Sequence, residues 1–224
     1  MKLLACALTL AMFVFGCSSS APNFEGSPST SDAGGTGGDS ATKPSSCQSW
    51  PSGSIGTTLG KAVSADLSWK GFLAQSTTAA TISSTDLYDC DGSKGINAII
   101  FDVSAEWCAA CQTQAADQPK LAADYAALGV KVVTLIVQDA FNKPATLATA
   151  ESWKKQYTLM DIAVCADPQF LFQPSASGSV SLPMTVIVDP RTMIIARISQ
   201  GYLAHYPLSV DADVVTLAKK NGAH

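Results

Sequence analysis

The amino-acid sequence predicts an α/β fold, a three-layer sandwich built around a mixed central sheet. From residue 96 onward, apolar β-branched runs alternate with helix-like segments, which is typical of parallel strands joined by helices. Two short apolar runs then flank a turn, which is typical of an antiparallel hairpin, and a last helix-like segment follows. Parallel and antiparallel strand pairs together make the sheet mixed.

The first predicted strand and helix lie at 96–103 and 109–128. The strand is apolar enough to be central in the sheet, and the helix carries apolar residues on one face and ends at Gly129. Pro119 lies inside this helix. Because proline lacks the N–H that a helix interior needs, we expect a kink or a break there.

The next predicted elements are a strand at 130–138, a helix at 146–157 and a short strand at 162–166. The first of these, VKVVTLIVQ, is largely β-branched, as buried parallel strands are. Pro144 lies just before the helix, where a proline is tolerated.

The C-terminal part predicts a hairpin of strands at 185–188 and 194–198 around a turn at 189–192. The last helix is predicted at 210–220. It has aspartates in its first turn and lysines in its last, an order that complements the helix dipole.

The N-terminus reads as an export signal. Residues 1–17 contain Lys2 and then an apolar run at 3–15, which is shorter than the ~20 residues of a transmembrane helix. The run ends in Val-Phe-Gly-Cys, which resembles the lipobox of bacterial lipoproteins, so Cys17 is the predicted lipidation site. The alternative is an ordinary signal peptide cut near Ala21. Either way we expect an exported protein, in a compartment where disulfides persist.

Two segments precede the alternating elements. Residues 18–46 are rich in Ser, Gly, Thr, Pro and Asp and predict a flexible tether. Segment 47–95 has no clean apolar period, and we expect short strands and loops that flank the core. A disulfide between Cys47 and Cys90 would stabilise the fold by about 3–4 kcal/mol in the chain-entropy model, although each could be a small buried residue. Cys165 is expected to be a buried free thiol, with pairing to Cys47 or Cys90 as the alternative.

Length and charge narrow the classes of function. The 224 residues fit one domain plus extra segments. The formal net charge is −4 and no basic cluster occurs, which argues against a nucleic-acid partner. Nothing in the sequence indicates an obligate interface, so we expect a monomer.

A Trp-Cys-Ala-Ala-Cys motif lies where the first predicted strand meets the first predicted helix. A helix N-terminus stabilises an anion, so the pKa of Cys108 is expected to fall below the free value of about 8.5. Cys111 lies one turn further on, within reach of a disulfide. The alternative, a zinc site, needs about four ligands, and His205 and His224 are far off in sequence. The motif therefore predicts a redox dithiol with no metal and no cofactor.

Two further residues suit such a dithiol. Asp102 lies inside the first apolar strand, either at an edge or buried with a raised pKa. A buried carboxylate is useful here, because disulfide exchange moves a proton on and off the second thiol. Pro183 directly precedes a predicted strand and is either an edge residue or a cis-proline.

The segments FDVSAEWCAAC and LPMTVIVD resemble the thioredoxin superfamily, and the export signal points to its TlpA/ResA-like branch of bacterial thiol-disulfide oxidoreductases. The resemblance covers residue 96 to the C-terminus. It implies a thioredoxin-like domain at 47–224, in which the N-terminal extension 47–95 replaces the strand pair usual before the motif. It also implies that Cys108 attacks, Cys111 resolves and Pro183 is a cis-proline facing them.

The same resemblance assigns roles to neighbouring residues. Asp102 matches the buried acid of thioredoxin, and Trp107 matches the tryptophan that shields the dithiol. The substrate strand is expected to pair with the backbone around Leu182. Ala109 and Ala110 depart from the Gly-Pro or Pro-Pro pairs common in the family, and this central pair strongly affects the direction of the reaction.

Together these inferences predict a thiol-disulfide oxidoreductase that reduces exported proteins at the periplasmic face of the cell envelope. Its expected partners are protein thiols and disulfides, a membrane electron donor and, through its lipid anchor, the membrane. One alternative is a peroxiredoxin-like peroxidase, although its threonine two or three residues before the reactive cysteine is absent. The other is a non-enzymatic copper-binding module, in which His205 or Met184 adds a ligand.

Overall fold

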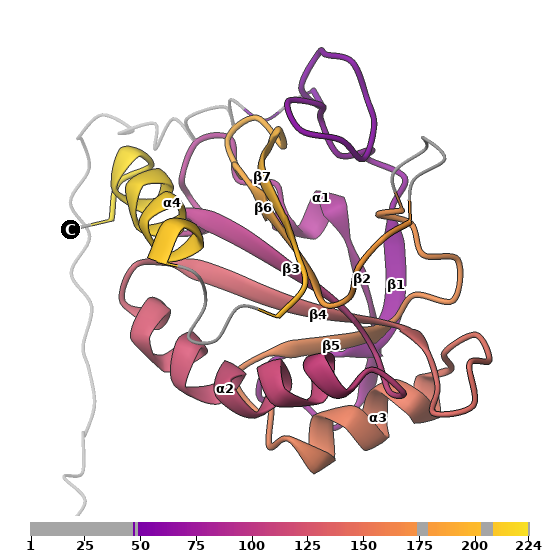
Figure 1. Cartoon of the computed structure of the whole chain (residues 1–224). Coiled ribbons are helices and arrows are strands. Elements are labelled where there is room, and N and C mark those ends of the chain that lie inside the picture. Colours follow the sequence, from indigo (N-terminus) through magenta and orange to yellow (C-terminus); the bar gives the residue numbers. More distant parts are fainter. Residues whose placement is uncertain (1–46, 48, 174–178, 203–207, 224) are drawn as a thin grey trace, which may run out of the picture. The chain divides into compact units, whose positions relative to one another are not determined.

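A seven-stranded mixed sheet organises the computed structural model (Figure 1). The predicted signal peptide at 1–17 with Cys17, and the predicted tether at 18–46, lie outside the described residues. No helix among the residues that are described is long and apolar enough to cross a membrane. The structure describes residues 47, 49–173, 179–202 and 208–223.

The strands follow the order β2-β1-β5-β4-β3-β6-β7 across the sheet. Neighbours β3, β4 and β5 run parallel, whereas the remaining neighbouring pairs are antiparallel. The mixed sheet that the sequence predicts is therefore confirmed. The bounds are β1 (Ser68–Phe72), β2 (Ala79–Ser83), β3 (Ala98–Ala105), β4 (Val130–Gln138), β5 (Ala163–Ala166), β6 (Met184–Val188) and β7 (Ile195–Gln200).

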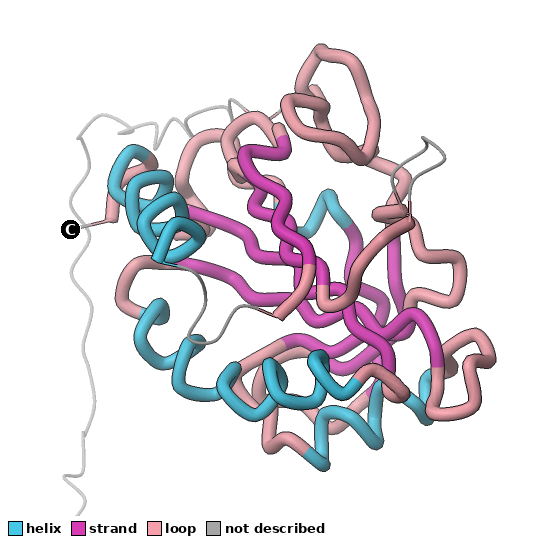
Figure 2. Tube along the Cα trace, in the orientation of Figure 1, coloured by secondary structure: helices cyan, strands magenta, loops and turns pink. Residues whose placement is uncertain are grey.

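Helices lie against the sheet, as the cyan segments of Figure 2 show. The buried Tyr125 hydroxyl of α2 donates a hydrogen bond to the Asp211 carboxylate of α4, so these two helices pack on the same face. The predicted helices occur within one or two residues of their expected bounds. The observed bounds are α1 (Ser84–Leu87), α2 (Ala109–Ala126), α3 (Leu147–Gln156) and α4 (Leu208–Lys220).

Helix α3 covers the opposite face of the sheet. Thr134 of β4 donates a hydrogen bond to Gln118 of α2, so the next residue, Leu135, points away from α2. Cys165 is the register partner of Leu135 and shares its direction. The buried Lys154 of α3 lies close to Cys165, which places α3 on that second face and completes the three layers.

The short strands expected in segment 47–95 occur as β1 and β2. They extend the central sheet, because β1 pairs with β5. Trp69 of β1 stacks in a buried aromatic cluster with Phe101 and Phe172, with ring centroids 5.5 and 6.0 Å away. These strands are short and partly exposed, so the sequence shows no sustained apolar run there.

Of the kink or break expected at Pro119, the structure excludes a break. Helix α2 runs continuously through this residue. The buried side chains Gln118 and Tyr125 hold the helix to its neighbours on both sides of the proline. Tertiary packing thus outweighs the loss of one backbone hydrogen bond.

The end of the N-terminal extension is fastened to the domain by a disulfide and a buried ion pair. Cys47 and Cys90 are joined with their Cα atoms 5.5 Å apart, and Cys165 is free and buried. Next to Cys90, the buried Asp89 carboxylate pairs with Arg191 at 3.0 Å. Arg191 lies in the β6–β7 turn, so the ion pair ties the extension to the hairpin.

Gly71 of β1 has no room for a side chain. A Cβ at this position would lie 2.2 Å from the carbonyl oxygen of Val164 and 2.7 Å from the sulfur of Cys165. We therefore expect Gly71→Ala to lower the free energy of unfolding by about 2 kcal/mol, because strands β1 and β5 must separate.

Urea denaturation measures this effect. Gly53→Ala is the matched control, because a Cβ there meets nothing within 4 Å, and it should change the stability by about 0.5 kcal/mol or less. Equal losses in the two variants would contradict the role given to Gly71.

Candidate active site

The two motif cysteines lie at the start of α2. Cys108 is the N-cap residue, and its Sγ accepts a hydrogen bond from the backbone N–H of Cys111 at 3.1 Å. The two side chains are joined in a disulfide, with Cα atoms 5.2 Å apart. Cys108 is 6% exposed and Cys111 is 0% exposed, so a substrate reaches the pair from the Cys108 side.

A cluster of buried polar side chains surrounds Asp102 on β3. Asp102 is fully buried, and its Oδ2 accepts a hydrogen bond from Ser104 Oγ at 3.0 Å. The side-chain amides of Gln114 and Gln118 donate to its two carboxyl oxygens. The Oε1 of Gln118 in turn accepts a hydrogen bond from Thr134 Oγ1 at 3.0 Å. Helix α2 and the sheet therefore hold this carboxyl in one place.

Burial sets the protonation of Asp102. Removal from water raises the pKa of this carboxyl from 3.8 to about 6. The hydrogen bonds from Ser104, Gln118 and Gln114 favour the charged form and limit the rise. The group can therefore both accept and release a proton close to neutral pH.

The two glutamines that bond the carboxyl lie on the same face of α2 as Cys111. Cys111, Gln114 and Gln118 are three and then four residues apart, so they lie along one face of α2, and all three are buried. Sequence reasoning missed both glutamines, because this residue type is mostly exposed. Their spacing from Cys111 was the available signal.

Leu182 and Pro183 directly precede β6. They lie at the end of the sheet where the C-terminus of β3 lies. The Leu182–Pro183 peptide bond is cis, and the carbonyl of Pro183 accepts a hydrogen bond from the N–H of Gly201 at 2.8 Å. The register that pairs Val103 of β3 with Met184 of β6 brings this peptide close to the end of β3, which leads to the motif.

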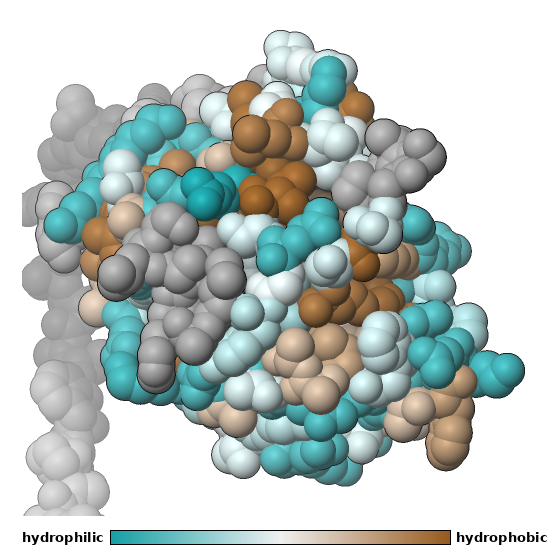
Figure 3. Space-filling view, viewed as in Figure 1, coloured by the Kyte–Doolittle hydropathy of each residue, from teal (hydrophilic) through white to brown (hydrophobic). Residues whose placement is uncertain are grey.

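Trp107 and Leu182 line one cavity, which we call the Trp107 groove. Its volume is about 470 Å³, and its walls also include Gln138, Pro168 and Phe170. Trp107 is 45% exposed, and its indole N–H donates to Gln138 Oε1 at 2.9 Å. None of the described residues that line the groove is charged. Figure 3 shows apolar surface in the middle of this face, where the chain enters β6 above the start of α2.

The described residues contain no cluster of three or more His, Cys, Asp or Glu side chains suited to hold a metal ion. Met184 is fully buried in β6, and His205 lies outside the described residues.

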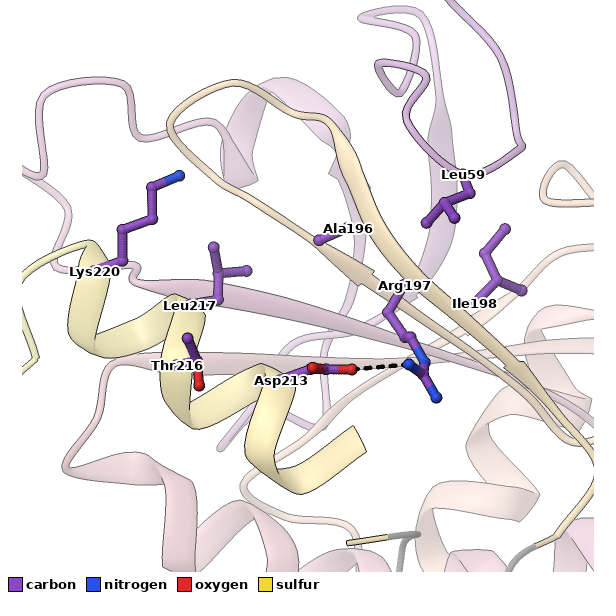
Figure 4. A pocket seen from close by; sticks show the side chains of 8 residues that line it. All are labelled: Leu59, Ala196, Arg197, Ile198, Asp213, Thr216, Leu217 and Lys220. Atoms are coloured by element: carbon purple, nitrogen blue, oxygen red, sulfur yellow. Dashed lines mark ion pairs between the residues drawn. The ribbon is translucent and has the colours of Figure 1, made fainter. Parts of the chain in front are cut away.

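Another cavity, of about 560 Å³, lies between β7 and α4 (Figure 4). Leu59 and Leu217 face it, and an ion pair of 3.2 Å joins Arg197 to Asp213 across it. Its lining contains no cysteine and none of the predicted site residues. It is therefore separate from the chemistry at Cys108.

The fold is shared with solved structures of redox proteins. A Chlorobium tepidum protein, whose proposed identity is the thiol:disulfide interchange protein DsbE, has a TM-score of 0.51 at 19% identity, covering 72% of this chain and 99% of its own. The Plasmodium vivax 2-Cys peroxiredoxin has a TM-score of 0.53 at 14% identity, covering 72% and 82%. Enterococcus faecalis AhpC has a TM-score of 0.51 at 14% identity, covering 74% and 96%. At these identities the likeness shows the fold.

Comparison with protein families gives a firmer result. No curated protein matches this chain. A family model, described as the AhpC/TSA family, matches residues 69–197, which include most of β1, the Cys-x-x-Cys motif, β6 and the first half of β7. Because the match spans more than half of the 224 residues, the chain belongs to the AhpC/TSA family.

Proposed function

We propose that this protein is a thiol-disulfide oxidoreductase that reduces disulfides of exported proteins through Cys108 and Cys111. One observation carries the proposal. The cysteine pair lies at the N-terminus of α2 and is reachable at Cys108, and Cys111 shares a helix face with Gln114, which donates to the buried carboxyl of Asp102. The fold and the family are those of redox proteins.

In the first step the Cys108 thiolate attacks one sulfur of the substrate disulfide. A bond forms between Cys108 and that sulfur, the substrate S–S bond breaks, and the other substrate sulfur leaves as a thiolate that takes a proton from water. The positive end of the α2 dipole and the backbone N–H of Cys111 stabilise the attacking thiolate.

In the second step Cys111 resolves the mixed disulfide. Its thiol gives a proton to Asp102 through water, and the resulting thiolate attacks Cys108 Sγ. The Cys108–Cys111 disulfide forms and the substrate leaves as a second thiolate, so two electrons have passed from the dithiol to the substrate. Gln114 and Gln118 hold the carboxyl that accepts the proton.

Turnover requires a reductant that restores the dithiol. We assign this role to a membrane electron donor at the periplasmic face of the cell envelope, near which a lipid on Cys17 would anchor the protein. A peroxidase would instead consume hydrogen peroxide with a thiol reductant. A copper-binding module would bind Cu(I) without reducing disulfides.

Trapping of a mixed disulfide tests the proposed function. With reduced protein and a protein disulfide such as insulin, Cys111→Ala accumulates a covalent adduct through Cys108, because the resolving thiol is missing. Non-reducing electrophoresis and mass spectrometry identify the adduct.

The matched control is Cys108→Ala, which retains only the buried thiol of the pair and forms no adduct. If Cys111→Ala traps no substrate, or if both variants trap it equally, the assignment of Cys108 as the attacking group is wrong.

A further inference from the structure

A buried threonine on β4 lies beside the carboxyl of the candidate site. Strands β3 and β4 are neighbours at the centre of the sheet (Figure 1), and Thr134 is the register partner of Asp102. Thr134 is fully buried, and its hydroxyl donates a hydrogen bond to Gln118 Oε1 at 3.0 Å. Burying a hydroxyl in a largely apolar strand costs free energy, and this hydrogen bond offsets the cost. The contact with Gln118 therefore indicates what the hydroxyl does.

The hydrogen bond from Thr134 fixes which end of the Gln118 amide meets the carboxyl. A side-chain amide accepts hydrogen bonds at its oxygen and donates them from its nitrogen. Because Thr134 donates to Oε1, the Nε2 of Gln118 is turned to Asp102 and donates to its Oδ2. An ionised carboxylate only accepts hydrogen bonds, so this orientation of the amide favours the charged form. The reverse orientation would present Oε1 to the carboxyl and favour the protonated form.

The other described partners of the carboxyl also donate to it. The Gln114 amide donates to Oδ1, and the Ser104 hydroxyl donates to Oδ2 at 3.0 Å. These side chains are buried, as are Gln118 and Thr134, so bulk water does not replace a hydrogen bond that is lost here. Gln118 differs from the other two donors because a further side chain, Thr134, holds its orientation.

The groups around the carboxyl leave its proton affinity to burial and hydrogen bonds. On α2, the titratable side chain on the face of the two glutamines is Cys111, and on β6 the register partner of Asp102 is the uncharged Thr185. Helix α4 packs on the same side of the sheet, and its Asp211 is bonded to Tyr125 in the last turn of α2. Burial raises the pKa of Asp102 and the three donors lower it, with no contribution from a charged side chain among the described residues.

We propose that Thr134 is a positioning residue, which holds the Gln118 amide with its N–H groups toward Asp102 and so keeps this carboxyl ionised and ready to accept the proton of Cys111. This inference rests on the proposed function and deepens its second step. Thr134 and Gln118 act through the carboxyl and take no part in the exchange of sulfur bonds.

Two titrations of the full-length protein test the proposal. Carbon-13 NMR of the reduced protein follows the Asp102 carboxyl from pH 4 to 9 without a substrate. Single-turnover reaction with a peptide disulfide, quenched with acid and resolved by mass spectrometry, gives the rate at which the mixed disulfide is resolved over the same range. In Thr134→Val, which removes the hydroxyl at nearly constant volume, we expect both midpoints to rise by about one pH unit. Thr134→Ser, which keeps the hydroxyl, restores the wild-type midpoints.

A second variant shows whether Thr134 acts through Gln118. Gln118→Met removes the donor at a similar side-chain length and should raise both midpoints by at least as much as Thr134→Val. Because Thr134 has no amide left to hold in that background, the double variant Thr134→Val/Gln118→Met should show no further rise. A further rise would overturn the proposal. If Thr134→Val fails to fold, the comparison of Gln118→Met with the wild type decides the role of the amide.

The matched control is Thr185→Val. Thr185 is the other register partner of Asp102 but is not among the described hydrogen-bond partners that act on its pKa, so both midpoints should stay at the wild-type values. Unchanged midpoints in Thr134→Val and Gln118→Met, or equal shifts in Thr185→Val, would overturn the positioning role and leave the proposed function standing. A wild-type protein that forms no mixed disulfide would overturn the proposed function itself, which the NMR titration does not depend on.

Discussion

Cys108→Ser lowers the rate of protein disulfide reduction by at least about 10³-fold, to the rate of the reductant alone. Two reasons support this expectation, the chemistry of serine and the burial of Cys111. A serine hydroxyl at neutral pH is neither ionised nor able to form a disulfide, and the remaining thiol of the pair, on Cys111, is 0% exposed. The assay is insulin reduction with dithiothreitol, followed by turbidity.

The control for this prediction is Cys165→Ser. Burial, together with the nearby Asp167 charge, raises the pKa of the Cys165 thiol from 9.0 to about 12, so this cysteine is an inert thiol at neutral pH. The variant should retain the wild-type rate. Residual activity of Cys108→Ser comparable to the wild type would contradict the account.

The second prediction is that Asp102→Asn makes the protein more stable at neutral pH and slower in catalysis. The pKa of Asp102 is raised by burial from 3.8 to about 6, so ionisation of this carboxyl in the folded state opposes folding. The stabilisation by the protonated carboxyl is complete below pH 4 and is lost as the pH rises to about 6. Asparagine mimics the protonated group in being uncharged, with an amide that carries two N–H donors in place of one O–H.

We therefore expect Asp102→Asn to gain about 3 kcal/mol over the wild type at pH 7, a difference that shrinks as the pH falls from 6 to 4. Asp167 is a second buried carboxyl whose pKa is raised to about 6, so the difference between variant and wild type isolates Asp102. Urea unfolding at several pH values measures it.

The same variant loses the proton acceptor for Cys111. Its rate of mixed-disulfide resolution at pH 7 should fall about tenfold or more, and the rise in rate that the wild type shows around pH 6 should disappear. Asp66→Asn, at an exposed position, is the control and keeps the wild-type pH profile. A variant that is less stable than the wild type at pH 7, with an unchanged pH profile, would contradict this role of Asp102.

The fold was largely predictable, because its centre consists of long buried runs. All eight residues of β3 are buried, and β4 is nearly so, and runs of this kind show directly in the sequence. Short strands were expected in this part of the chain, but the bounds of β1 were not predictable, because it is only five residues long and has no sustained apolar run. Gly71 further weakens the sequence signal of β1, because glycine is uncommon inside strands. The structure requires glycine there, because Cys165 of β5, far away in the sequence, approaches the backbone closely.

The candidate site was predictable only in part. Cys108 and Cys111 have a local signature, and their position at the start of a helix follows from sequence order. Gln114 was not predictable, because nothing local shows that a polar residue on α2 faces a carboxyl on β3.

The most direct test of the account is the reduction potential of the Cys108–Cys111 pair. Equilibration in glutathione buffers, followed by alkylation and mass mapping of all cysteines, gives its value. The account predicts reversible two-electron reduction of this pair near the thioredoxin value of about −270 mV, with Cys47–Cys90 remaining oxidised. A value near −120 mV would reverse the proposed direction, and a pair that glutathione cannot reduce at any ratio would contradict a redox function altogether.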